Sequence, residues 1–350
     1  MKKALRLALV ACVSVIGLAV AGSALAAYTP KLVVNQSVLR VSQGGGTTIH
    51  VLQSKNDSAT AKATIYAPVG YRATLSQTPG TQIGTVTAKA NATAISADAV
   101  LPLDGVVKVA DPSTIADAAT LCTGTATHTA TWLLVLTAAG RTLSVPVYVD
   151  TTTGDEAQIG STKLQICLPP PDVPEASGGA AFGAKLIDAL FTVNGIFTLP
   201  ASNGQYVWSG LFTPYLPAVG KPNPAATVES RSFVRLPVIL SLNAKVLSRK
   251  NRTVSLRGAL NEAMSGIAAT KVTLSVNGKA SFTAKTNASG VFRGVLRVKK
   301  GTYTFRVKAV VPDRNITSTG CAGATLAPAG CVSATAGGFT VLSAIVRVKV

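Results

Sequence analysis

The chain has 350 residues, of which 47% are hydrophobic and 13% charged, and 33 Lys and Arg against 14 Asp and Glu give a formal net charge of +19. This composition is too apolar for a disordered chain, and 31 Gly and 18 Pro argue against a helical bundle or a coiled coil. The length allows two or three separate cores.

The first 26 residues have the pattern of a secretory signal, with cations at the start, an uncharged apolar stretch from Leu7 to Gly22, and the small-x-small motif at Ala24 to Ala26. We therefore expect residues 1–26 to be removed and the mature chain to start at Ala27. Two alternatives remain: residues 7–27 are long enough to stay as a membrane anchor, and residues 9–12 resemble a lipoprotein box. No later segment is apolar over 18 residues, so we predict no transmembrane span in the mature chain.

Residues 27–168 alternate apolar and polar residues in short runs that Gly, Pro, Asn and Asp interrupt. This period of two predicts strands, and their regular spacing predicts an N-terminal antiparallel β-sandwich. One short helix is expected over residues 112–121, with Asp111 as its N-cap. The expected strands cover residues 32–41, 47–52, 62–66, 105–109, 129–136, 142–149 and 164–168.

Four cysteines lie beyond the signal, which itself contains Cys12. An even number in an exported chain suggests two disulfides, and although three pairings are possible, proximity favours Cys122 with Cys167 and Cys321 with Cys331. No CxxC motif occurs and neither histidine lies near a cysteine cluster, so we predict no metal site.

Residues 169–180 are rich in Pro and Gly and are expected to form a linker. Strands are expected over residues 186–199, 205–212 and 227–236, but the segment 181–236 is small for a core of its own. It either docks on the first half or forms a small second sandwich.

The pattern is clearest in residues 237–350, where alternating apolar residues surround turns such as Asn277-Gly278, a dipeptide that suits a type I′ hairpin. The runs VSLRGAL (254–260), VTLSV (272–276), TNASGVF (286–292) and GTYTF (301–305) resemble those of bacterial immunoglobulin-like and carboxypeptidase-regulatory-like modules of exported proteins. The resemblance implies an immunoglobulin-like sandwich with a non-catalytic accessory role, and it implies no ligand residues.

The charge is unevenly distributed. Residues 27–175 contain 9 Lys and Arg against 10 Asp and Glu, residues 176–229 contain 2 against 2, and residues 230–350 contain 19 against 2. Alternation predicts that Arg293, Arg297 and Lys299 point to solvent from one strand. It predicts the same for Arg306 and Lys308 on the next strand. If these strands form a hairpin through Lys300-Gly301, all five cations share one face.

A second cluster of cations, expected where the last domain begins, consists of Arg249, Lys250, Arg252 and Arg257. The two groups predict a surface that attracts a polyanion, such as an anionic cell-wall polymer or polysaccharide. The alternative is a solvated face whose cations keep strand edges from aggregating. Without outward aromatic residues or a recognition motif, sequence-specific nucleic-acid binding is not expected.

No catalytic arrangement emerges. His50 and His128 are the only histidines, and each is interpreted as a polar strand residue; no G-x-S-x-G motif occurs. Asp150, Asp155 and Glu156 lack an ordered ligand spacing, which favours a solvated turn over a calcium site. Four aromatic residues could form a carbohydrate platform, but core packing is favoured; these are Tyr206, Trp208, Phe212 and Tyr215.

The sequence thus predicts an all-β protein of two or three antiparallel, immunoglobulin-like β-sandwich domains in tandem after an N-terminal signal peptide. We expect an exported, non-catalytic accessory or structural protein, secreted or held at the cell surface, without a cofactor, whose basic domain (237–350) binds anionic polymer. Two alternatives are a secreted hydrolase using carboxylates of the N-terminal half and an interaction module that pairs through open strand edges.

Overall fold

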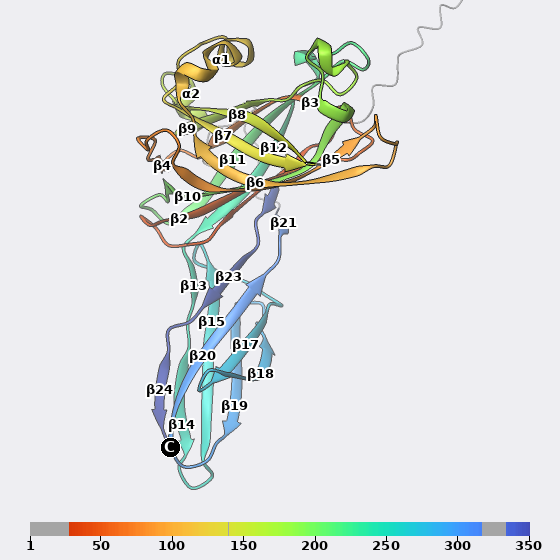
Figure 1. Cartoon of the computed structure of the whole chain (residues 1–350). Coiled ribbons are helices and arrows are strands. Elements are labelled where there is room, and N and C mark those ends of the chain that lie inside the picture. Colours follow the sequence, from red (N-terminus) through yellow and green to blue (C-terminus); the bar gives the residue numbers. More distant parts are fainter. Residues whose placement is uncertain (1–27, 139, 317–333) are drawn as a thin grey trace, which may run out of the picture.

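The computed structural model describes residues 28–138, 140–316 and 334–350. Two bodies stand end to end: a wide curled sheet, and an elongated pair of smaller sheets that ends near the C-terminus (Figure 1). Strands dominate both, and all pairings but one are antiparallel within the described residues, so the all-β fold class is confirmed. No helix in this part of the chain is long and apolar enough to cross a membrane.

The first body is one sheet, to which the described residues contribute fourteen strands. In spatial order these are β1 (Lys31–Gln36), β2 (Gly44–Leu52), β10 (Ala184–Thr198), β5 (Gln82–Ala92), β6 (Val100–Val109), β7 (Ala130–Ala138), β8 (Arg141–Thr151), β9 (Thr162–Cys167), β3 (Thr60–Ala67), β11 (Gly204–Pro214), β12 (Val228–Leu236), β22 (Ala334–Ala336) and β21 (Arg314–Ile316), with β4 (Arg72–Ala73) on β10.

The helices of this body are short. Asp111 caps the predicted one, its side-chain Oδ1 accepting a hydrogen bond from the Ser113 amide at 3.0 Å. The helix begins as a 3₁₀ turn, Pro112–Ile115, and continues as α1 (Ala116–Thr123), which a disulfide joins to β9. The other helical segments are α2 (Glu156–Ile159) and the 3₁₀ turns Glu175–Ser177, Ala181–Gly183 and Pro224–Ala226.

The sheet curls until its first strand lies beside β12. This seam is made by serine side chains: Ser230 Oγ accepts a hydrogen bond from the Leu32 amide at 2.9 Å, and Ser232 Oγ accepts one from the Val34 amide at 2.8 Å. Glycines allow close packing within the curl, because a Cβ at Gly84 or Gly105 would lie within 2 Å of a carbonyl oxygen of the neighbouring strand. The concave side encloses one apolar core, in which Trp132 and Trp208 are fully buried.

The predicted division at residues 169–180 is wrong, because β10, β11 and β12 belong to the same sheet as the first half. Strand β10 lies between β2 and β5, and β11 pairs with β3. Residues 181–236 therefore dock on the first half, which was one of the two alternatives. The Pro- and Gly-rich segment is a folded connection, in which the Ala180 amide donates to the Pro170 carbonyl at 2.8 Å.

The second body is a sandwich of two five-stranded sheets. Apolar side chains from both sheets meet between them, with Val254, Phe292 and Phe305 among the most buried. One sheet contains β13 (Val238–Leu240), β14 (Asn243–Ser248), β15 (Thr253–Glu262), β16 (Ser265–Gly266) and β19 (Val291–Arg297), and the other β17 (Lys271–Val276), β18 (Lys279–Lys285), β20 (Thr302–Val311), β23 (Phe339–Leu342) and β24 (Val346–Lys349).

The predicted turn at Asn277-Gly278 is confirmed. It joins β17 to β18, and its two residues have φ angles of 48° and 80°, the positive values that a type I′ hairpin requires.

Chain crossings and a buried ion pair connect the two bodies. The chain leaves the curled sheet from β12 to β13 and returns to it with β21 and β22, and Leu39 packs against both cores. Glu262, only 5% exposed, receives a hydrogen bond from Arg314 Nη2 at 2.8 Å and lies 3.9 Å from Arg235 Nη1.

Candidate functional site

The predicted basic residues lie on the sandwich, but on more than one surface. Strand β19 pairs with β15, so Arg293 lies directly opposite Arg257, and Arg297 lies opposite Thr253. All three arginines are exposed on the outer face of this sheet. Two guanidinium groups are thus neighbours across a strand pair, an arrangement that destabilises a sheet unless an anion lies between them.

Arg306 and Lys308 lie on the outer face of the other sheet. Their strand β20 pairs with β17, β23 and β24, and on β24 the exposed Arg347 and Lys349 add to the same surface. The predicted hairpin of β19 with β20 is therefore wrong. Lys300-Gly301 instead connects the two sheets, since β19 belongs to one and β20 to the other. The Gly301 amide and carbonyl form hydrogen bonds with Val350, next to β24.

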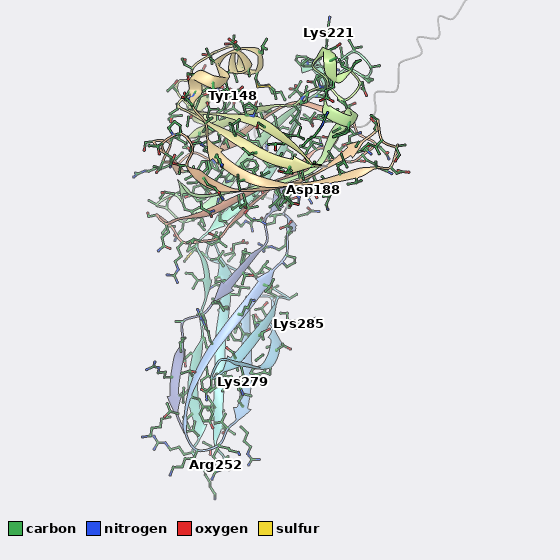
Figure 2. The ribbon with its side chains drawn as sticks, viewed as in Figure 1. Tyr148, Asp188, Lys221, Arg252, Lys279 and Lys285 are labelled. Atoms are coloured by element: carbon green, nitrogen blue, oxygen red, sulfur yellow. A yellow bond between two sulfur atoms is a disulfide. The ribbon has the colours of Figure 1, made fainter. Side chains whose placement is uncertain are left out.

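The other predicted cluster lies at the free end of the sandwich, far from the curled sheet, rather than where the domain begins (Figure 2). Arg249, Lys250 and Arg252 form the turn between β14 and β15. The end of β19 joins them, because Arg297 Nε donates to the Asn251 carbonyl at 3.3 Å and the Val298 amide donates to the Arg252 carbonyl at 2.9 Å. We call this group the distal tip, comprising Arg249, Lys250, Arg252, Arg297 and Lys299.

No carboxylate among the described residues forms an ion pair with any of the nine predicted cations. The two acidic residues of this region lie at the junction instead. Glu262 binds Arg314 and Arg235, and Asp313 Oδ1 accepts a hydrogen bond from the Gly338 amide. The distal tip and both outer faces therefore hold uncompensated positive charge, which salt or an anionic partner would screen.

The histidines are both bonded to aspartates. His50 Nε2 lies 2.8 Å from Asp188 Oδ1, and Lys89 lies 3.6 Å from the same carboxylate. His128 has a second partner that the sequence did not suggest. Its Nδ1 lies 2.8 Å from Asp150 Oδ2, and its Nε2 lies 3.0 Å from Thr123 Oγ1.

The order carboxylate, imidazole, hydroxyl is that of a catalytic triad, but the surroundings of Thr123 are structural. Its hydroxyl bonds the Ala119 carbonyl at 2.9 Å, within helix α1, and the His128 side chain is 1% exposed and packs against Tyr148. The Thr123 hydroxyl thus donates its proton to the helix backbone, and the buried imidazole is not accessible to a substrate. We interpret the hydrogen bonds of Asp150, His128 and Thr123 as a structural link between α1 and β8.

The acidic residues Asp150, Asp155 and Glu156 do not form a calcium site. Asp150 binds His128, and Glu156 receives hydrogen bonds from Lys163 Nζ at 2.8 Å and from Tyr66 Oη at 3.1 Å. Among the described residues no group of three or more His, Cys, Asp or Glu could hold a metal ion.

The aromatic residues pack in the core, as favoured from the sequence. Trp208 and Phe212 are fully buried, and Trp208 makes edge contacts with Tyr71 and Phe197. Tyr215 is 9% exposed and donates to the Leu168 carbonyl. Tyr206 bonds Ser202. A carbohydrate platform is therefore not formed by these side chains.

Of the two expected disulfides, Cys122–Cys167 is present, with an S–S distance of 2.10 Å. The second, Cys321–Cys331, lies outside the described residues.

Two carboxylates of the N-terminal half share one hollow. Asp57 and Asp172 line a hollow of about 190 Å³, but Lys185 lines it too, and its Nζ donates to the Asp57 carbonyl at 2.8 Å. Both carboxylates already accept backbone hydrogen bonds, Asp57 Oδ2 from the Thr29 amide at 2.9 Å and Asp172 Oδ2 from the Ala218 amide at 3.3 Å.

No family model matches the chain, and no curated protein matches it. Among solved structures, the D0-D1 domain of intimin is similar over 89% of this chain and 98% of its own, with 7% identity and a TM-score of 0.19. A protein of Corynebacterium diphtheriae described as membrane anchored is similar over 88% of this chain and 53% of its own, with 10% identity and a TM-score of 0.20. Likeness at this level carries no functional inference.

Proposed function

We propose that this is an exported, non-catalytic protein of the cell envelope whose basic sandwich binds an anionic polymer through the distal tip and the two outer faces. The observation that carries the proposal is the excess of positive charge in residues 230–350, with 19 Lys and Arg against two carboxylates that are both engaged at the junction.

The arrangement of these cations suits a polymer better than a small anion. On a strand, outward residues recur about every 7 Å, and neighbouring strands lie about 5 Å apart. Arg257 and Arg293 are cross-strand neighbours, and Arg297 continues the row towards the distal tip. A chain with repeating negative charges can contact several of these groups at once, releasing bound counterions from each.

Export is supported by the signal-like residues 1–26 and by the disulfide between Cys122 and Cys167. Disulfides persist in oxidising compartments outside the cytosol. An envelope also supplies the partner, since wall polymers and acidic polysaccharides are anionic.

The test is binding of the purified protein to long-chain polyphosphate and to polygalacturonate across a salt series. We expect affinity to fall steeply with salt, and the triple variant Arg249→Ser/Lys250→Ser/Arg252→Ser to bind at least about tenfold more weakly. Its plot of log affinity against log salt should be shallower by about 2, as expected when three charge contacts are lost.

The matched control removes three exposed cations of the curled sheet, Lys31→Ser/Arg72→Ser/Lys108→Ser, and therefore lowers the net charge by the same amount. It should bind nearly as well as the unaltered protein. Equal losses in the two triple variants would show that binding follows net charge alone, and binding that does not change with salt would exclude an electrostatic site.

A further inference from the structure

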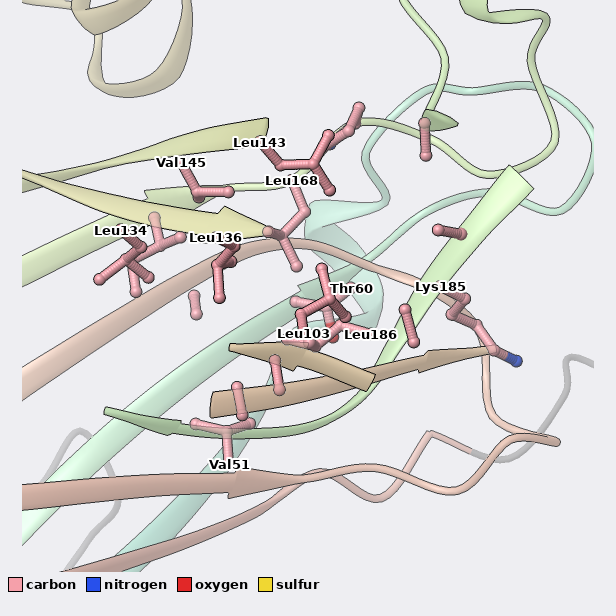
Figure 3. A pocket seen from close by; sticks show the side chains of 18 of the residues that line it. Val51, Thr60, Leu103, Leu134, Leu136, Leu143, Val145, Leu168, Lys185 and Leu186 are labelled. Atoms are coloured by element: carbon pink, nitrogen blue, oxygen red, sulfur yellow. The ribbon is translucent and has the colours of Figure 1, made fainter. Parts of the chain in front are cut away.

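The interior of the curled sheet is filled unevenly. Trp132 and Trp208 occupy one part of it, but another part holds a cavity of about 240 Å³. Leucine and valine side chains from β6, β7 and β8 point into this space, among them Leu103, Leu136 and Val145 (Figure 3). The space is larger than the ~150 Å³ apolar cavity that is known to stay dry and to bind benzene.

Alanines on two paired strands leave the space open. Ala88 of β5 lies directly opposite Ala189 of β10, and Ala90 lies opposite Leu186, on the other side of a register shift between Leu186 and Asp188. These positions face inward, where larger apolar residues would have closed the core. An unfilled apolar space forgoes the contacts that normally stabilise a core, so an apolar group that enters it would recover them.

The cavity continues into a polar mouth. Lys185 lies at the boundary, with its Nζ directed away from the apolar space and hydrogen-bonded to the carbonyls of Lys55 and Asp57 (Figure 3). The adjoining hollow of about 190 Å³ shares Lys185 and Pro171 with the cavity and adds the carboxylates of Asp57 and Asp172. The site thus changes from apolar inside to polar at the mouth, which matches a molecule with a chain and a head.

The charges at the mouth indicate the kind of head. Two carboxylates face one ammonium group, which already donates to two backbone carbonyls. An anionic head would meet more repulsion than attraction there. Carboxylate oxygens accept hydrogen bonds readily, so a head with hydroxyl groups and no charge suits these partners.

The described chain also begins at this mouth. Tyr28 Oη hydrogen-bonds Thr60 Oγ1 at 2.8 Å, and the Thr29 amide donates to Asp57 Oδ2 at 2.9 Å. Thr60 lines the cavity and Asp57 lines the hollow.

We propose that the cavity takes up the acyl chain of a single-chain amphiphile whose head is uncharged and carries hydroxyl groups, as in a monoacylglycerol. Burial of the chain in an apolar pocket supplies the affinity, and the few polar groups at the mouth set the orientation.

The test uses the neutral fluorophore N-phenyl-1-naphthylamine with the full chain and with the chain that starts at Ala27. We expect saturable binding at one site and displacement by monolaurin at a concentration at least about tenfold lower than that needed for laurate at pH 8. Laurate has a chain of the same length, so this comparison isolates the head.

Two variants fill the cavity from different strands, Ala90→Phe on β5 and Ala189→Phe on β10. Each should weaken fluorophore binding at least about tenfold while the thermal unfolding midpoint is retained. The matched control is Thr87→Phe, an exposed position on the outer face of β5, which should bind normally. If one variant fails to fold, the other still tests the site.

Four results would overturn the proposal. The fluorophore could fail to bind to either chain. It could also bind to both cavity-filling variants as strongly as to the unaltered protein. Binding by the chain that starts at Ala27 together with none by the full chain would show that the chain's own N-terminal segment is the occupant. Displacement by laurate as readily as by monolaurin would reject the uncharged head.

Discussion

The two bodies use the same alternating strands but differ in what they enclose and what they display. The curled sheet surrounds a wide core with room for a cavity, and residues 27–229 are almost electrically neutral. The sandwich has a narrow core, and residues 230–350 carry an excess of 17 positive charges. Inward-facing residues therefore determine whether each body folds, whereas outward-facing residues are free to determine what each body binds.

The largest expected effect lies where the bodies join. Glu262→Ala leaves Arg235 and Arg314 half-buried without their carboxylate, and breaking a buried pair in this way costs about 3–5 kcal/mol. Urea unfolding should show this loss. The control is Glu175→Ala, which removes an exposed pair with Arg141 and should cost less than about 1 kcal/mol. Equal effects would mean that the junction does not couple the bodies.

The next effect concerns the curled sheet alone. The Cys122–Cys167 disulfide closes a loop of 45 residues between α1 and β9, so the double variant Cys122→Ala/Cys167→Ala should lose about 2–4 kcal/mol of unfolding free energy. Binding to polyphosphate should be unchanged, because the sandwich is not touched. A parallel loss of polymer binding would contradict the division of roles.

Alkali should also act on the curled sheet. Burial raises the pKa of Tyr28 to about 12, and burial likewise raises the pKa values of Tyr66, Tyr71, Tyr148 and Tyr215. A tyrosine with a raised folded pKa contributes its stability below pH 10 and loses it as pH rises towards the folded pKa. Unfolding free energy should therefore fall between pH 10.5 and 12.

Two lysines act in the opposite direction, because burial lowers the pKa values of Lys62 and Lys185. Their contribution makes stability rise with pH, but only up to the unfolded pKa of lysine, about 10.5. Above that pH the two lysines contribute no further rise in stability. The unfolding free energy of Tyr28→Phe should therefore fall by up to about 2 kcal/mol less than that of the unaltered protein between pH 10 and pH 12. An identical pH profile for the variant would contradict the assignment.

The smallest effect is expected on the sandwich. Arg257→Thr removes the like charge opposite Arg293 and should raise the unfolding free energy by about 0.2–1 kcal/mol at low salt. The gain should shrink at high salt, where both guanidinium groups are screened. Destabilisation at low salt would show that the two arginines are not repelling each other.

Alternation along the chain was enough to predict which cations face outward, as Arg293, Arg297, Arg306 and Lys308 are all exposed. It could not predict which strand lies beside which. A glycine turn between two strands, as at Lys300-Gly301, has the same local signature in a hairpin and in a connection between two sheets, and only the distant contact of Gly301 with Val350 selects the second.

Other features depended on contacts remote in sequence. Strand β5 was not expected, because its Ala, Thr and Lys residues carry little β signal, and it is held by β6 and β10 on either side. The Pro-rich residues 169–180 indicated a break in regular structure but not whether the flanking strands share a sheet. The cavity follows from alanines that face one another only after β10 inserts.

The serine seam has a consequence for how the protein forms. The Leu32 amide finds its acceptor on Ser230, 198 residues later in the chain, and β12 is completed in turn by β22, close to the C-terminus. Contacts of such long sequence separation form slowly. The first strand can pair with β2 early, but the seam that closes the sheet cannot form before Ser230 and Ser232 have been synthesised.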